Sequence, residues 1–234
     1  TLPSDSTEPV TFTTDGSYFY YGQVPFPGWD SLSNIYRVGT GMNGTVAGEI
    51  EPIPNLSIPI NSSLFFRDGF LYTCTGSLDN LLQINPLTGD TTRVSIPDSL
   101  LWTTGSSTQW RGCYFYYDGQ YLYNLGIGTE NHPNKFVVRT FDPSANWSKV
   151  SDDIILNGST IPMVMSFIVV DGYLIMYENY INLYLRRYKL SDGVFEEEWP
   201  YRIPSKQFYT FTYDYSNNFI YFNRFSPVSG SYVP

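Results

Sequence analysis

Five aspartates recur through the chain, and their type and spacing make them the first candidates for chemistry. They follow one another at intervals of about 43 to 53 residues and are Asp15, Asp68, Asp118, Asp171 and Asp214. Carboxylates that converge on one cavity can hydrolyse glycosides, one as general acid and another as base or nucleophile. Four of the five are followed by glycine, however, and Asp-Gly is a strong signal for a tight turn. We therefore interpret the five aspartates as turn residues rather than catalytic acids.

The other nucleophiles and metal-ligating residues are too few for a recognisable site. His132 is the only histidine and lies in a loop beside Pro133, so neither a multi-His metal site nor a convincing Ser-His-Asp triad is expected. Cys74 and Cys113 lack zinc-site spacing, and we expect small buried thiols, with a disulfide as the alternative. The acidic runs Asp152–Asp153 and Glu196–Glu198 do not form a calcium-loop pattern. We predict no catalytic residue, no metal and no cofactor.

Each Asp-Gly turn stands between two segments rich in Tyr, Phe and Leu. In the second repeat, Ser63–Arg67 leads into the turn and Phe70–Cys74 leads out, which predicts a hairpin with positive φ at both turn residues. Leu81–Ile84 and Thr91–Ile96, separated by an Asn-Pro turn, predict a second hairpin. Four strands in a unit of about 40 to 50 residues are typical of a β-propeller blade.

The outer hairpin of the first repeat is predicted in the same way. Its strands are Ile35–Val38 and Thr45–Ile50, and its turn is Gly39–Gly44. No helical periodicity competes with strands anywhere in the chain.

We predict an all-β fold, a β-propeller of four-stranded antiparallel blades in a single domain covering residues 1–234. The expected blades are residues 9–54, 63–97, 108–157 and 164–200, with a partial fifth at 208–234. After the first hairpin of the fifth blade there is room for one short strand at most, and an unpaired sheet edge must be covered. We therefore expect a fragment of a larger propeller, or an open assembly completed by another polypeptide. Thr1 in place of Met indicates a removed leader or a piece of a longer chain.

The repeats resemble the blades of kelch and WD40-like β-propellers. The likeness rests on Asp68–Tyr72, which reads Asp-Gly-Phe-Leu-Tyr, and on Leu82–Asp90, which contains Ile-Asn-Pro-Leu-Thr-Gly-Asp. The paired glycines of kelch blades and the Trp-Asp ending of WD40 blades are absent. The segment Ile35–Gly48 is similar to propeller blades of giant ubiquitin ligases of the PAM/Highwire type. That resemblance implies a scaffold that presents partners in the cytoplasm.

Composition excludes two classes of partner. The formal net charge is −9 and no basic run is present, so we expect no nucleic acid to bind. The longest mostly apolar run, Met163–Val170, is far shorter than the roughly 20 residues needed to span a bilayer. Aromatic residues make up 18 % of the chain, and we expect most of them to be buried between blades.

Two groups of residues remain as candidate surface features. Five Asn-x-Ser/Thr sequons fall in predicted turns or connections, where a glycan would not disturb the sheets; they are Asn43, Asn55, Asn61, Asn146 and Asn157. They predict an extracellular or cell-surface protein, with a cytoplasmic scaffold as the alternative. Trp29, Trp102 and Trp110 are candidates for a binding surface, because aromatic side chains are enriched at interaction sites.

These features favour a non-enzymatic scaffold or interaction module in a larger, extracellular assembly. Its partners would be a protein or further blades of the same protein, and glycans are a further option. The first alternative is a carbohydrate-binding propeller lectin, which predicts equivalent pockets in every blade. The second is a propeller glycosidase, which predicts two or three carboxylates converging from the innermost strands.

Overall fold

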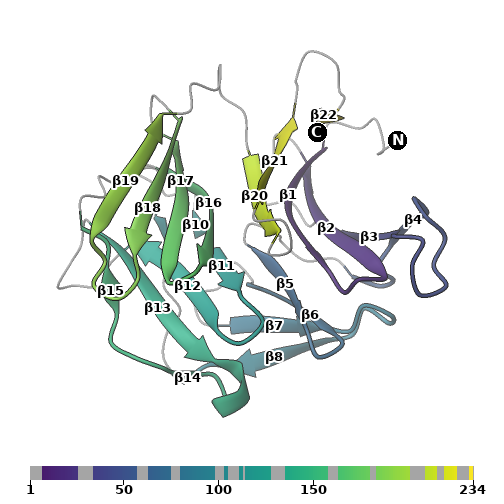
Figure 1. Ribbon diagram of the computed structural model, residues 1–234. Coiled ribbons are helices and arrows are strands. Elements are labelled where there is room, and N and C mark those ends of the chain that lie inside the picture. Colours follow the sequence, from purple (N-terminus) through teal and green to yellow (C-terminus); the bar gives the residue numbers. More distant parts are fainter. Residues whose placement is uncertain are drawn as a thin grey trace. The chain divides into compact units, whose positions relative to one another are not determined.

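The computed structural model describes the backbone of residues 7–25, 34–56, 63–74, 80–97, 103–104, 111–112, 114–127, 135–157, 163–179, 183–200, 209–214, 219–225 and 232–233. Within these residues the secondary structure is β, apart from one 3-10 turn at Pro143–Ala145. The strands pair antiparallel with their neighbours in sequence (Figure 1).

The first two sheets are four-stranded meanders. One contains β1 (Thr7–Thr14), β2 (Tyr18–Pro25), β3 (Ile35–Gly39) and β4 (Ile50–Pro52) in that order. The other contains β5 (Leu64–Arg67), β6 (Phe70–Cys74), β7 (Asn80–Ile84) and β8 (Thr91–Ser95). Strand β4 begins later than predicted: Thr45–Glu49 is not strand, because the chain passes through left-handed conformations at Gly44 and Gly48 (φ 82° and 76°).

The later sheets repeat the meander. The third contains β11 (Tyr114–Tyr117), β12 (Leu122–Ile127), β13 (Phe136–Asp142), β14 (Ser148–Lys149) and β15 (Ile154–Ile155), the last paired with β13. The fourth contains β16 (Met163–Val170), β17 (Tyr173–Asn179), β18 (Leu183–Lys189) and β19 (Phe195–Pro200). A three-stranded sheet of β20 (Tyr209–Asp214), β21 (Phe219–Phe225) and β22 (Tyr232–Val233) and a short pair of β9 (Thr103–Thr104) and β10 (Arg111–Gly112) complete the described strands.

The chain divides into two compact units. The first comprises Thr1–Leu100 with Ser144–Ser148, and the second comprises Leu101–Pro143 with Lys149–Pro234. Within the first unit β1 lies beside β5, and within the second β11 lies beside β16 and β16 beside β20. Consecutive sheets thus meet through their first strands, as propeller blades do. The prediction of an all-β propeller built from four-stranded antiparallel blades is confirmed; the single domain stays a prediction.

Each unit has its own apolar core between consecutive blades. In the first unit Tyr20 and Ile35 from one blade pack with Leu71 and Ile84 from the next. In the second, Leu125 and Phe136 pack with Leu174 and Tyr188 in the same way. Consecutive residues are buried in β6 and β13, as expected for strands of a sheet that is covered on both faces. Cys74 is buried, whereas Cys113 lies outside the described residues.

The inner turn, which joins the first two strands of a blade, occurs in two lengths. Arg67 pairs with Phe70 and Val170 with Tyr173, so Asp68-Gly69 and Asp171-Gly172 form two-residue turns. All four turn residues have positive φ, between 49° and 84°, as predicted for these turns. Thr14 instead pairs with Phe19, and Tyr117 with Leu122, which leaves four residues in each of the other two inner turns.

In the four-residue turns the aspartate side chain accepts hydrogen bonds from its own turn and from the strand that follows. One carboxylate oxygen of Asp15 accepts bonds from the backbone N–H of Ser17 and of Tyr18 (2.8 and 2.7 Å). The other accepts from the hydroxyl of Tyr20 (2.7 Å), whose pKa is raised by burial and then by this bond. Asp118 binds Gln120, Tyr121 and Tyr123 in the same pattern. Both oxygens of each carboxylate are thus used locally.

We expect Asp15→Ala to destabilise the protein by about 2–3 kcal/mol, because three donors lose their acceptor and the Tyr20 hydroxyl is partly buried. Urea unfolding followed by fluorescence measures the change. Asp171→Asn is the control: asparagine accepts the left-handed conformation of a two-residue turn, so this variant should stay within about 0.5 kcal/mol of the wild type. Equal effects of the two substitutions would contradict the distinction between the turns.

Candidate interaction surface

The outer turn, which joins the third and fourth strands of a blade, has a common backbone design in three blades. The N–H of its first residue bonds to the C=O of its last, and a glycine N–H bonds back to the C=O of the first. The N–H groups of Gly39, Asn85 and Lys189 donate to the C=O groups of Glu49, Asp90 and Val194, respectively. The N–H groups of Gly48, Gly89 and Gly193 donate to the C=O groups of Gly39, Asn85 and Lys189 in turn, and all six distances are 2.8–3.0 Å. We call the three glycines the turn glycines; their φ values are 76°, 76° and 70°. Such values favour glycine over any residue with a Cβ.

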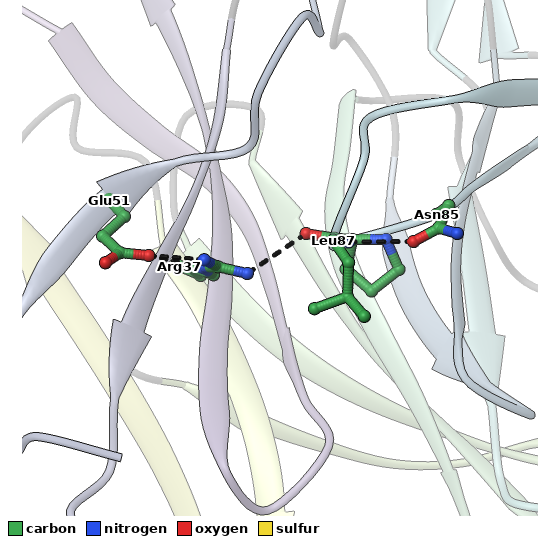
Figure 2. A network of polar contacts seen from close by, with 5 residues as sticks. Arg37, Glu51, Asn85 and Leu87 are labelled. Atoms are coloured by element: carbon green, nitrogen blue, oxygen red, sulfur yellow. Dashed lines mark hydrogen bonds and ion pairs between the residues drawn. The ribbon is translucent and has the colours of Figure 1, made fainter.

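The outer turn of the second blade is anchored to the first blade by Arg37 on β3 (Figure 2). The guanidinium donates from Nε to Glu51 at 2.8 Å and from Nη1 to the carbonyl oxygen of Pro86 at 3.3 Å. It also lies 5.0 Å from the ring centroid of Tyr18, a cation–π arrangement. Within the turn, the Asn85 side chain accepts the N–H of Leu87 at 2.9 Å. Leu87 therefore lies on a turn whose backbone is bonded to Arg37 of the first blade and to the side chain of Asn85 within the turn.

The outer turns of the first unit expose large apolar side chains. Met42 and Val46 in the first blade are 63 % and 64 % exposed, and Leu87 in the second is 69 % exposed. Apolar side chains on fixed turns can enter a partner's pocket with little further loss of conformational entropy. In the second unit, Val194 at the end of an outer turn is 47 % exposed.

Cross-strand ion pairs engage three carboxylates of the acidic runs noted in the sequence, Asp153, Glu196 and Glu197. Arg139 on β13 donates to Asp153 at 2.7 and 2.9 Å, and Lys149 lies 3.0 Å from the same carboxylate. The hydrogen bond from Arg139 lowers the pKa of Asp153, and burial opposes the shift. Arg187 on β18 similarly pairs with Glu196 and Glu197 at 3.3 Å. These carboxylates form ion pairs with arginines on the neighbouring strand, and Glu51 forms such a pair with Arg37.

The structure describes four of the five sequon asparagines, and all four side chains are exposed. Asn43, Asn55 and Asn146 have φ values of 53° to 55°, which explains locally why asparagine suits these turns. Asn157 is exposed beside the end of β15. The amide nitrogen of Asn43 donates to the Ser17 hydroxyl at 2.8 Å. Asn61 lies outside the described residues.

The predicted aromatic surface cannot be placed, since Trp29, Trp102 and Trp110 lie outside the described residues, as does His132. One tryptophan that the sequence did not single out is Trp147. It is 7 % exposed, and its ring centroid lies 5.5 Å from that of Tyr72. The guanidinium carbon of Arg67 lies over the Trp147 ring, 5.9 Å from its centroid. The exposed apolar residues of the outer turns were also missed, although Met42 and Val46 in a glycine-rich turn were a usable signal.

The aspartates of the inner turns do not form a cluster in the part of the chain that the structure describes. Asp15 and Asp118 are engaged within their own turns, and Asp68 is paired with Arg67 at 3.1 Å. The side chain of Asp214 lies outside the described residues. Among the described side chains, no three His, Cys, Asp or Glu residues are grouped to hold a metal ion. No helix within the described ranges has the length and apolarity to cross a membrane.

The Arg139–Asp153 pair predicts a pH dependence of stability. Because the pKa of Asp153 is lower in the folded state, the pair stabilises the fold above about pH 4, and this contribution is lost as pH falls through the folded pKa. We expect Asp153→Asn to lower the free energy of unfolding by about 1 kcal/mol at pH 7, and the difference from wild type to shrink at pH 3. Asp152→Asn is the control, because Asp152 is exposed; it should change the free energy of unfolding at pH 7 by less than about 0.5 kcal/mol in the same urea titrations.

No family model and no curated protein matches this sequence. Several solved structures are similar in fold. Glutaminyl cyclase from Myxococcus xanthus has a TM-score of 0.54 and 10 % identity, over 93 % of this chain and 86 % of that chain.

Two further structures have lower scores. Hydrazine synthase from Kuenenia stuttgartiensis has a TM-score of 0.48 and 14 % identity, over 96 % of this chain, and this chain spans 58 % of its length. A chain of a nidogen/laminin complex has a TM-score of 0.46 and 9 % identity, over 85 % and 81 % of the two chains. At these identities, what the likeness to the cyclase shows is the β-propeller fold.

Proposed function

We propose that this protein is a non-enzymatic propeller module that binds a protein partner within a larger, extracellular assembly. The observation that carries the proposal is the presentation of Met42, Val46 and Leu87 on the hydrogen-bonded outer turns of the first unit. Large apolar side chains held away from the core lower the free energy of the protein only when a partner covers them.

The rigidity of these turns favours binding. Leu87 lies in a turn closed by two backbone bonds and by the Asn85 side chain, and Arg37 fixes that turn from outside. A side chain on such a turn loses little backbone entropy when a partner contacts it, so more of the burial energy appears as affinity.

The state of the acids supports binding over catalysis. A glycosidase needs two carboxylates free to exchange protons with substrate and water. Asp15 and Asp118 instead accept three hydrogen bonds each, from their own turns and from a tyrosine of the strand that follows, and Asp153 is held by Arg139 and Lys149. We infer that these three carboxylates stabilise the folded chain and do not act on a substrate.

The sequons support the extracellular location. Asn55 and Asn157 are exposed at the ends of outer strands, and Asn43 and Asn146 at turns. An N-linked glycan at any of the four would extend into solvent without displacing a strand.

We expect the triple variant Met42→Ser, Val46→Ser and Leu87→Ser to lose its partner while keeping its fold. Proximity labelling in the cells that make the protein measures partner recovery, and thermal unfolding measures stability. The partners of the wild type should be recovered at least tenfold less with this variant, because three apolar contacts are lost. The matched control, Met42→Leu, Val46→Ile and Leu87→Met, keeps apolar tips and should recover them as the wild type does.

Unchanged recovery with the serine variant would contradict the proposal. Hydrolysis of aryl glycosides by the purified protein would favour the glycosidase, and a consistent pattern of binding on a glycan array would favour the lectin.

The extracellular part of the proposal has its own measurement. The protein is isolated from its native source, and its intact mass is measured before and after enzymatic deglycosylation. The mass should fall towards that of the bare polypeptide. Peptide maps should place glycan at Asn55 and Asn157. Substituting both to Gln should remove most of that mass difference. An identical mass before and after treatment would contradict this location.

A further inference from the structure

Among the four described sequon asparagines, Asn43 is the one that stands beside an exposed large apolar side chain. Its neighbour Met42 is 63 % exposed, and Val46, three positions further on, is 64 % exposed. The other three, Asn55, Asn146 and Asn157, adjoin the buried residues Leu56, Trp147 and Leu156, respectively. A glycan on Asn43 would therefore stand on the surface that the proposed function assigns to the partner.

The backbone that carries Asn43 is fixed by a tight turn within the outer turn of the first blade. The N–H of Thr45 donates to the carbonyl oxygen of Met42 at 3.0 Å, and the Thr45 hydroxyl donates to the same oxygen at 2.8 Å. Asn43 and Gly44 have φ values of 53° and 82°. Positive φ at both central residues is the pattern of a type I′ turn, for which Asn-Gly is a preferred pair. The Cβ of Asn43 therefore has a fixed place beside Met42.

The side chain of Asn43 is also held. Its amide nitrogen donates to the hydroxyl oxygen of Ser17, in the inner turn of the same blade, at 2.8 Å. That nitrogen carries two hydrogens, and the bond to Ser17 uses one of them. A glycan replaces one hydrogen and leaves the other, so the modification is compatible with the bond to Ser17. The first sugar would then be attached to a nitrogen that is kept close to Met42.

We propose that Asn43 is an N-glycosylation site whose occupancy regulates the docking surface formed by Met42 and Val46. In copies that carry the glycan, its first sugars lie over these two side chains and exclude the partner, because a bulky hydrated group prevents the desolvated contact that apolar side chains make. Copies without the glycan bind the partner. The inference rests on the proposed function as an extracellular interaction module and names how its surface is regulated.

The modification transfers a sugar chain from a donor that is an oligosaccharide linked to a lipid through a diphosphate. The amide nitrogen of Asn43 forms a bond to the anomeric carbon of the first sugar, and the bond from that carbon to the diphosphate oxygen breaks. The nitrogen loses one proton, and the lipid diphosphate leaves. Thr45 supplies the hydroxyl residue that completes the sequon.

The occupancy of Asn43 in free and partner-bound copies tests the proposal. Protein from its native source is cross-linked and separated by size into free chain and complexes. Each fraction is deglycosylated enzymatically in H₂¹⁸O, which converts every glycosylated asparagine into ¹⁸O-labelled aspartate, and peptide maps give the occupancy of each sequon. Asn43 should carry glycan in the free copies and be occupied at least tenfold less in the complexes. The occupancy of Asn55 should be equal in the two fractions.

Two variants separate the position of the glycan from the loss of a glycan. Asn43→Gly and Asn55→Gly each remove one exposed acceptor, and glycine accepts the φ values of 53° and 55° at these positions without adding a charge. In proximity labelling, Asn43→Gly should recover the partner at least threefold more than the wild type, because every copy can then bind. Asn55→Gly should recover it as the wild type does, and thermal unfolding checks that both variants fold.

The regulation is overturned if Asn43 carries no glycan in the free copies, if its occupancy is the same in free and bound copies, or if the two glycine variants recover the partner equally. Any of these results leaves the proposed function standing when the serine variant of Met42, Val46 and Leu87 still loses the partner. Recovery of the partner by that serine variant contradicts the proposed function itself and the regulation with it.

Discussion

Close contact between two backbones at a glycine joins the first blade to the second and the third blade to the fourth, and the register of each pair depends on it. At Gly89 and Gly193 the chain leaving one blade lies directly on the outer turn of the next, with no side chain between them. Backbone contact of this kind tolerates no added atom, so it fixes where the next blade begins more strictly than apolar packing does. The buried Leu56 and Leu156 then fill the space beside the contact.

Hydrogen bonds and ion pairs of charged side chains further link the strands within a blade and the first blade to the second. Arg37 joins an acid on its own blade to a carbonyl on the next, and Arg139 and Arg187 hold acids across the outer strands of their blades. In the inner turns, the carboxylates of Asp15 and Asp118 satisfy backbone donors that the tight reversal leaves unpaired. The chain has few charged residues, and these ones bond to backbone N–H groups in the inner turns or form ion pairs across the outer strands.

The sequence was sufficient for the repeat and its strands because alternating aromatic residues and Asp-Gly pairs are local signals. The two inner-turn lengths were not separated, although the sequence differs between them: a tyrosine that bonds to the carboxylate stands five residues after Asp15 and Asp118, and Thr73 and Met176 stand at the same position after Asp68 and Asp171. Thr45–Glu49 was predicted as strand because Thr45 and Val46 are good strand formers, but the left-handed conformations of Gly44 and Gly48 on either side prevent an extended strand there. The exposed apolar side chains of the outer turns were missed: the glycine-rich turn around Met42 and Val46 was a signal in the sequence, but the exposure of Leu87 depends on how the turn packs.

The two inner-turn lengths alternate along the chain: four residues in the first and third blades and two in the second and fourth. The covered glycines alternate with them, since both belong to blades with the short turn. The structural period of this chain is therefore a pair of unlike blades, one that supplies the covering segment and one that receives it. Moving or duplicating a single blade would place two donors or two receivers together, whereas a pair would carry its own junction intact.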